Sequence, residues 1–127
     1  MKIILSNKQL VNNMIVVEGT TEIGSIKGLW KCAEKPVIGE IYFVELSIEN
    51  LHRNQIWIKE NMKKPKVYTE GEYVWFRGIC EDIDEVYYIR FALDWLEMVE
   101  INEDNTIKVG DCILFNQRYD HIAIYPY

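Results

Sequence analysis

Apolar and polar residues alternate with a period of two along most of this chain, a pattern that predicts β-strands. The alternation is clearest over residues 26–32 and 41–49, where one face is apolar and the other carries lysines, glutamates or serine. Residues 33–39 between them contain a proline and a glycine, which is typical of a connection. We therefore expect 26–32 and 41–49 to be two neighbouring antiparallel strands.

Further apolar segments predict hairpins along the rest of the chain. Residues 73–80 predict a central strand, which we expect to pair with residues 86–91 across an acidic connector. A last hairpin is predicted from residues 110–115 and 120–125. The shorter predicted strands are residues 56–58 and two segments within 5–17 that meet at Asn12 and Asn13.

The segment 92–99 fits two structures. Leu93 and Leu96 have helical spacing, yet the segment directly continues a strand. We expect a strand whose exposed face changes near Asp94 and Trp95, as a β-bulge would produce. A short helix is the alternative.

Many short strands without a long amphipathic helix predict an all-β protein. The length of 127 residues suits one domain, so we expect residues 1–127 to form a single unit. Gly28 and Gly78 lie inside predicted strands and suit the sharp coiling of a small barrel. We expect an OB-like, partly open barrel of five to six antiparallel strands. A two-sheet β-sandwich is the alternative.

Charge narrows the class of partner. The formal net charge is −6, which argues against a general nucleic-acid binder, because such proteins neutralise phosphates with an excess of basic residues. Residues 1–66 hold ten basic and seven acidic residues (+3), whereas residues 67–127 hold four and thirteen (−9). The acidic half either keeps the surface soluble or attracts a basic protein partner.

The residues with reactive side chains show no catalytic or metal-binding motif. Cys32, Cys80 and Cys112 are widely spaced and lie in apolar runs, so we expect reduced, buried thiols. Cys112 and His121 are the one plausible nucleophile and base, from strands expected to be adjacent, but no family motif surrounds them. We expect no enzyme activity, no cofactor and no metal. The absence of a secretory or membrane-spanning segment predicts a cytoplasmic protein that does not associate with membranes.

Aromatic residues close to lysines favour an alternative function, single-stranded nucleic-acid binding by an OB-like barrel. Trp30 shares an apolar face with Ile26 and is expected in the core. The residues that would form the nucleic-acid surface are Trp57, Trp75, Lys63, Lys64 and Lys66, within or near the basic stretch 59–66.

Acidic and aromatic residues of the later strands predict a protein-binding surface instead. Carboxylates accelerate encounter with a basic partner, and aromatic side chains supply the desolvated contact area. Acidic residues continue as far as Glu103 and Asp104. The candidate binding residues are Glu81, Asp82, Asp84, Glu85, Tyr87, Tyr88, Asp94, Trp95 and Glu97.

Residues 87–98, 109–113 and 122–127 resemble the C-terminal half of small cytosolic bacterial immunity proteins, which protect against polymorphic or contact-dependent toxins. The resemblance implies a non-enzymatic protein that binds and neutralises a cognate toxin. Where the toxin is a basic nuclease, such inhibitors are commonly acidic and cover its active site. The resemblance therefore implies a basic toxin as partner rather than a nucleic acid.

Overall fold

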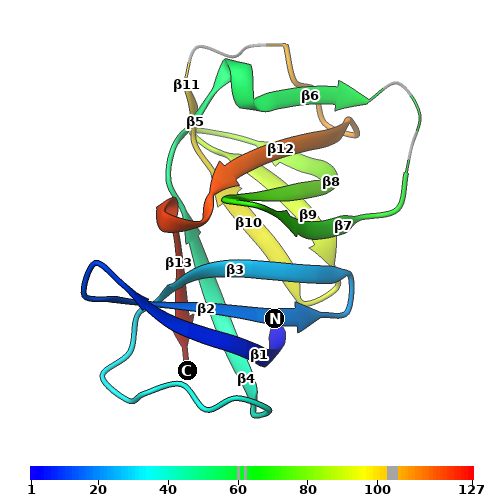
Figure 1. Cartoon of the computed structure of the whole chain (residues 1–127). Helices are drawn as coiled ribbons and strands as arrows, with labels where there is room; N and C mark the ends of the chain where they lie inside the picture. The colour runs from blue at the N-terminus through cyan, green and yellow to red at the C-terminus, as the bar shows by residue number, and fades with distance from the viewer. Residues whose placement is uncertain (60, 62, 103–105) are drawn as a thin grey trace.

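Five strands close into a barrel in the computed structural model, which describes residues 1–59, 61, 63–102 and 106–127 (Figure 1). The order is β1-β2-β3-β13-β4 and back to β1, antiparallel at each contact except the parallel pair β13–β3. This order confirms the small OB-like barrel, although the ring of pairings is complete rather than partly open. The barrel strands are β1 (Lys2–Val11), β2 (Met14–Thr21), β3 (Gly24–Trp30), β4 (Ile41–Ile48) and β13 (Ile122–Pro126).

The chain between β4 and β13 builds a second group of strands beside the barrel (Figure 1). The long strand β8 is its centre and pairs with β7, β9 and β12, while β6 adds to β12 and β10 adds to β9. Among the residues described, no helix has the length and apolar character needed to cross a membrane. The elements are β5 (Leu51–His52), η1 (Arg53–Gln55), β6 (Ile56–Lys59), β7 (Lys66–Glu70), β8 (Tyr73–Ile83), β9 (Tyr87–Ala92), β10 (Trp95–Val99), β11 (Ile101–Asn102), β12 (Cys112–Arg118) and η2 (Tyr119–His121).

The barrel and the second group of strands share one apolar core. Phe76 and Phe115 stack with ring centroids 5.0 Å apart, and Phe91 packs on Phe76 at 5.8 Å. The same cluster of buried side chains includes Ile3 and Ile124 of the barrel, both fully buried. Burial of apolar side chains from both groups therefore holds them together.

A close backbone contact joins the two groups at Gly24. Gly24 pairs with Val67 of β7, and its φ is +138°, in the region that favours glycine. A Cβ placed on Gly24 would lie 1.8 Å from the carbonyl oxygen of Val67. The junction between the barrel and β7 therefore requires glycine at this position.

The first hairpin forms as its sequence predicts. Asn12 and Asn13 connect β1 to β2 with φ values of 49° and 64°. Two consecutive residues with positive φ are typical of the type I′ turn, whose twist matches that of the strands it joins, and asparagine tolerates this conformation. The strand-turn-strand prediction within residues 5–17 is confirmed.

Two predicted strand pairs are wrong. β3 and β4 are not neighbours, because β13 lies between them and pairs with both. β12 and β13 do not form a hairpin: β12 pairs with β6 and β8, and η2 redirects the chain into the barrel. In both cases a strand distant in sequence takes the position that the nearest segment was expected to fill.

The segment 92–99 reverses direction instead of continuing as one strand. Leu93 and Asp94 form the turn between β9 and β10, which pair antiparallel. The register shifts between Trp95 and Leu96, so the expected irregularity is present, but beside a turn rather than within one strand. The helical alternative is also wrong. The hairpin of β8 and β9 is confirmed.

Candidate functional site

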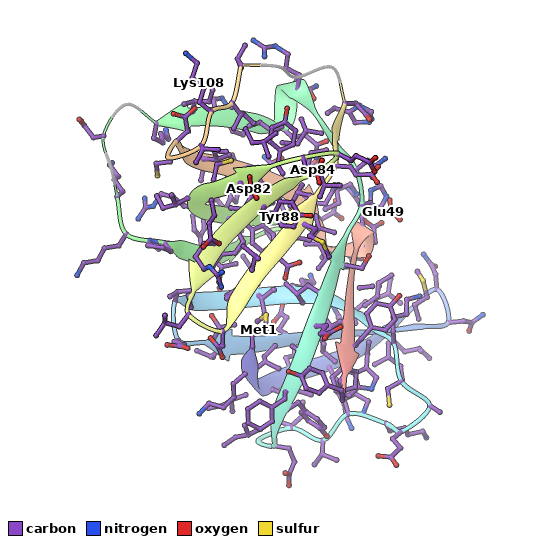
Figure 2. All side chains as sticks on the ribbon, turned by 180° about the vertical axis from the view of Figure 1, so that it is seen from behind. Met1, Glu49, Asp82, Asp84, Tyr88 and Lys108 are labelled. Atoms are coloured by element: carbon purple, nitrogen blue, oxygen red, sulfur yellow. The ribbon has the colours of Figure 1, made fainter. Side chains whose placement is uncertain are left out.

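Three of the predicted acidic residues gather where β8 turns into β9. Asp82, Asp84 and Glu85 are exposed, and Asp82 is the register partner of Tyr88 on β9. Figure 2 labels Asp82, Asp84 and Tyr88 close together on the side of the molecule where β9 and β10 face the viewer. The backbone N–H of Ile83 donates to Oδ1 of Asp82 at 2.8 Å, which fixes that carboxylate at the end of β8. A carboxylate group and an aromatic ring thus share one surface.

Glu81 differs from its neighbours because it is paired. Nη2 of Arg90 lies 2.8 Å from Oε2 of Glu81, and Nε of Arg90 donates to the same oxygen at 2.9 Å. Arg90 also donates to the carbonyl oxygen of Leu93 at 3.1 Å, which directs the guanidinium along the hairpin. This pair lowers the negative charge available at one edge of the surface.

Tyr87 and Asp94 lie away from the centre of this acidic group. Tyr87 is half-buried and packs against the core. Asp94 is exposed at the turn between β9 and β10, the opposite end of that hairpin from the turn between β8 and β9. Glu103 and Asp104, which were expected to extend the acidic face, lie outside the described residues.

Trp95 and Glu97 are buried, with exposures of 3% and 8%, so neither presents its side chain to a partner in this structure. Nε1 of Trp95 donates to Oε1 of Glu97 at 2.9 Å. Burial raises the pKa of Glu97 to about 7, opposed by the Trp95 hydrogen bond and the N-terminal ammonium, while Glu45 raises it further. Their expected place on a protein-binding surface, with Trp95 at its centre, is corrected: both side chains belong to the interior.

Leu96 and Met98 take the outward positions that were expected of Trp95 and Glu97. Burial alternates along β10, with Leu96 38% and Met98 65% exposed. Met98 is the register partner of Tyr88, so the two lie side by side next to Asp82. The sequence Trp-Leu-Glu-Met-Val has apolar residues in both phases of a two-residue period, and this ambiguity concealed the outward pair.

A second surface occupies the outer face of the sheet formed by β6, β12, β8 and β7. Trp57 stacks on Trp75 with centroids 5.3 Å apart, and Tyr68 stacks on the other side of Trp75 at 6.1 Å with an interplanar angle of 5°. Trp75 and Tyr68 are register partners on β8 and β7, while Trp57 comes from the edge strand β6. We call these three residues the aromatic row.

Basic side chains border the aromatic row. Nζ of Lys66 lies 5.3 Å from the ring centroid of Tyr68, and Lys66 is the register partner of Arg77. Nε of Arg77 donates to the carbonyl oxygen of Lys64 at 2.8 Å, which brings the loop with Lys63 and Lys64 to the same edge. The structure therefore brings Trp57, Trp75, Lys64 and Lys66 of the predicted nucleic-acid surface together with Tyr68 and Arg77.

Trp30 lies in the core, as its alternation predicts. It is 6% exposed, packs edge-on against Tyr42, and donates from Nε1 to the carbonyl oxygen of Glu34 at 2.8 Å. The indole N–H thus has a partner, and Trp30 takes no part in the aromatic row.

A polar groove of about 950 Å³ lies where β4, η1, β12 and η2 meet. Nδ1 of His121 lies 3.3 Å from Oε2 of Glu49 on its wall, and buried Gln117 donates to the carbonyl oxygen of Glu49 at 3.2 Å. Cys112 does not line the groove, since it pairs with Lys59 and Ile79 at the other end of β12. The expected adjacency of Cys112 and His121 is therefore wrong.

The cysteines divide into two kinds. Cys80 and Cys112 are buried as expected, but Cys32 is exposed in the loop after β3. Burial is the main cause that raises the pKa of the Cys80 thiol, and Asp111 raises it further. Across the described ranges, no group of three or more His, Cys, Asp or Glu side chains is arranged to hold a metal ion.

Comparison of the chain with protein-family models, with curated proteins and with solved structures gives no match. Function is therefore inferred from the two surfaces described above.

Proposed function

We propose that this protein is a non-enzymatic protein-binding module that neutralises a toxin domain with a basic surface. The observation that carries the proposal is the arrangement at the end of the β8–β9 hairpin. Exposed Asp82, Asp84 and Glu85 border an outward pair of Tyr88 and Met98. We call these five residues the acidic surface.

The acidic surface has the composition of a protein interface. Tyrosine and methionine are enriched at the centres of interfaces, where they fill pockets and exclude water. Carboxylates at the rim raise the rate of encounter with a positively charged partner. In a basic nuclease, the arginines and lysines that hold substrate phosphates are the partners that these carboxylates would pair with.

The resemblance to immunity proteins of toxin systems supplies the class of partner. An inhibitor of this class acts by covering the toxin's active site, so it needs neither a cofactor nor a catalytic group of its own. It would act in the cytoplasm, the compartment expected from the sequence.

The direct test searches the genome of the host for a toxin domain encoded beside this gene, and co-expresses and purifies that domain with this chain. We expect a one-to-one complex that abolishes toxin activity, with association that slows as salt is added. The variant Asp82→Asn, Asp84→Asn, Glu85→Gln should slow association about tenfold at low salt and flatten its salt dependence.

The matched control removes the same charge from the barrel by Glu22→Gln, Glu34→Gln and Glu40→Gln, three exposed residues remote from the β8–β9 turn in sequence. The proposal requires this control to associate faster than the acidic-surface variant. Equal rates for the two, or no inhibition by the unmodified protein, would contradict it.

A further inference from the structure

The outer face of the sheet of β6, β12, β8 and β7 carries features that the proposed function does not use. The aromatic row of Trp57, Trp75 and Tyr68 is partly exposed: Trp75 and Tyr68 are half-buried, and Trp57 is 41% exposed. These strands cross the upper half of the molecule in Figure 1, whereas β9 and β10, which carry Tyr88 and Met98, come to the front when it is seen from behind in Figure 2. The two surfaces are therefore separate.

Three neighbouring side chains on this face are aromatic and lie outside the apolar core. Alternation along β8 sends Val74 and Phe76 into the core, both 0% exposed, and sends Trp75 to the outer face. A soluble sheet normally covers its outer face with polar side chains. Stacked rings there are a continuous π surface to which a planar ligand can add.

Basic side chains outnumber acidic ones around the aromatic row. Lys66 and Arg77 lie beside Tyr68 and Trp75 as one cross-strand pair, and Lys59 extends the edge strand past Trp57. The adjoining loop brings Lys64 against Arg77. On the paired strand positions of this face, Glu70 follows Tyr68 at the same two-residue spacing at which Lys66 precedes it, so one carboxylate lies beside the row on the side of the β7–β8 turn.

We propose that this face binds single-stranded nucleic acid. Bases would stack on the aromatic row, starting from the exposed ring of Trp57, and phosphates would contact Lys66, Arg77 and the loop lysines. A chain with net charge −6 can do this because a phosphate responds mainly to the charges near it: at physiological salt, screening limits the reach of each exposed charge to about 8 Å. This binding does not depend on the proposed toxin binding.

The experiment follows intrinsic tryptophan fluorescence while the whole protein is titrated with a short oligothymidylate at two salt concentrations. We expect quenching, an affinity that falls as salt rises, and weaker binding of a duplex of the same length, whose bases cannot stack on the row. Trp57→Ala should weaken binding about tenfold. Lys66→Ala should reduce the slope of log affinity against log salt concentration by about one, because one phosphate contact is lost.

Matched controls are Tyr125→Ala, which removes an exposed ring from β13, and Lys35→Ala, which removes a charge from the loop between β3 and β4. Both should bind as the unmodified protein does. The acidic-surface variant should also retain oligothymidylate binding, so failure of this inference and failure of toxin binding are distinguishable.

Ultraviolet cross-linking of the unmodified protein to oligothymidylate, followed by peptide mapping, tests the site without a variant. Cross-links at Trp57, Tyr68 or Trp75 support the inference. Three results would overturn the inference. The first is absence of quenching at low salt, and the second is a duplex that binds as tightly as oligothymidylate while Trp57→Ala has no effect. The third is polyglutamate that binds as tightly as oligothymidylate, which would assign the face to an acidic protein.

Discussion

The indole N–H of Trp95 donates a hydrogen bond of 2.9 Å to Oε1 of Glu97, and both side chains are buried at the edge of a cavity of about 420 Å³ between β4 and β10. Met1 lines the same cavity, and its ammonium donates to the carbonyl oxygen of Val44 at 3.2 Å. The first residue of the chain and a strand near residue 97 therefore meet around one buried carboxyl group. That carboxyl makes stability depend on pH.

The pH dependence has a defined sign. Because folding raises the pKa of Glu97 from 4.5 to about 7, the folded state holds this proton more tightly than the unfolded state. Its contribution to stability is complete below the unfolded pKa and is lost as pH rises through about 7. By linkage the loss amounts to roughly 3 kcal/mol at most. Glu97→Gln, which cannot ionise but keeps an acceptor for Trp95, should flatten this fall.

The measurement is the free energy of unfolding in urea across that pH range, compared between Glu97→Gln and the unmodified protein. The difference between the two isolates Glu97 from other titrating groups. A Glu45→Gln variant serves as control: Glu45 is the smallest of the causes that shift the pKa of Glu97, so this variant should keep most of the fall in stability. The assignment is wrong if the two stability curves stay parallel.

The cysteines predict a simple count of reactive thiols. Cys32 is exposed, whereas Cys80 and Cys112 are buried, and the thiolate of Cys80 is further disfavoured by its raised pKa. A thiol reagent should modify Cys32 rapidly in the native protein and the other two only on unfolding. Cys32→Ser should abolish the rapid phase. Fast modification of two or more thiols in the native state would disagree with this burial.

The junction at Gly24 predicts a difference between two glycines with positive φ. Gly24→Ala places a methyl group against the carbonyl of Val67 and strains the backbone, so we expect a loss of about 3 kcal/mol or more. Gly39 has a φ of +89°, but a Cβ added there would have nothing within 4 Å, so Gly39→Ala should cost only about 1 kcal/mol. Urea unfolding measures both, and equal losses would show that the junction is not tight.

Local signals in the sequence predict the strands and the first turn well. Alternation identifies β3, β4 and β8, and Asn12-Asn13 identifies the turn because positive φ at two successive residues favours asparagine. Pairing between distant strands leaves no such local signal. β13 lies between β3 and β4 because burial of Ile122 and Ile124 in the barrel outweighs the short connection to β12.

The candidate site was predictable only in part, for the same reason. Exposed Asp82, Asp84 and Glu85 follow from a polar turn between two apolar strands. The inward position of Trp95 does not follow, since it depends on where the turn at Leu93 and Asp94 sets the phase of β10. The stack of Trp57 on Trp75 needs β12 between their strands, a pairing of segments that lie far apart in the chain.

The side of the sheet that each residue of β10 faces gives the sharpest test of the acidic surface, because Met98 and Val99 are neighbours on opposite faces of this strand. Met98 is 65% and Val99 0% exposed. Val99→Ala should lower the free energy of unfolding by about 2 kcal/mol, since it removes buried apolar contacts. Met98→Ala should change stability by less than about 0.5 kcal/mol but weaken toxin binding, because it removes contact area next to Tyr88. Urea unfolding and binding titration of both variants decide the outcome. A Met98→Ala protein that is destabilised and binds normally would show that Met98 faces the core, and the proposed surface would then lack its apolar centre.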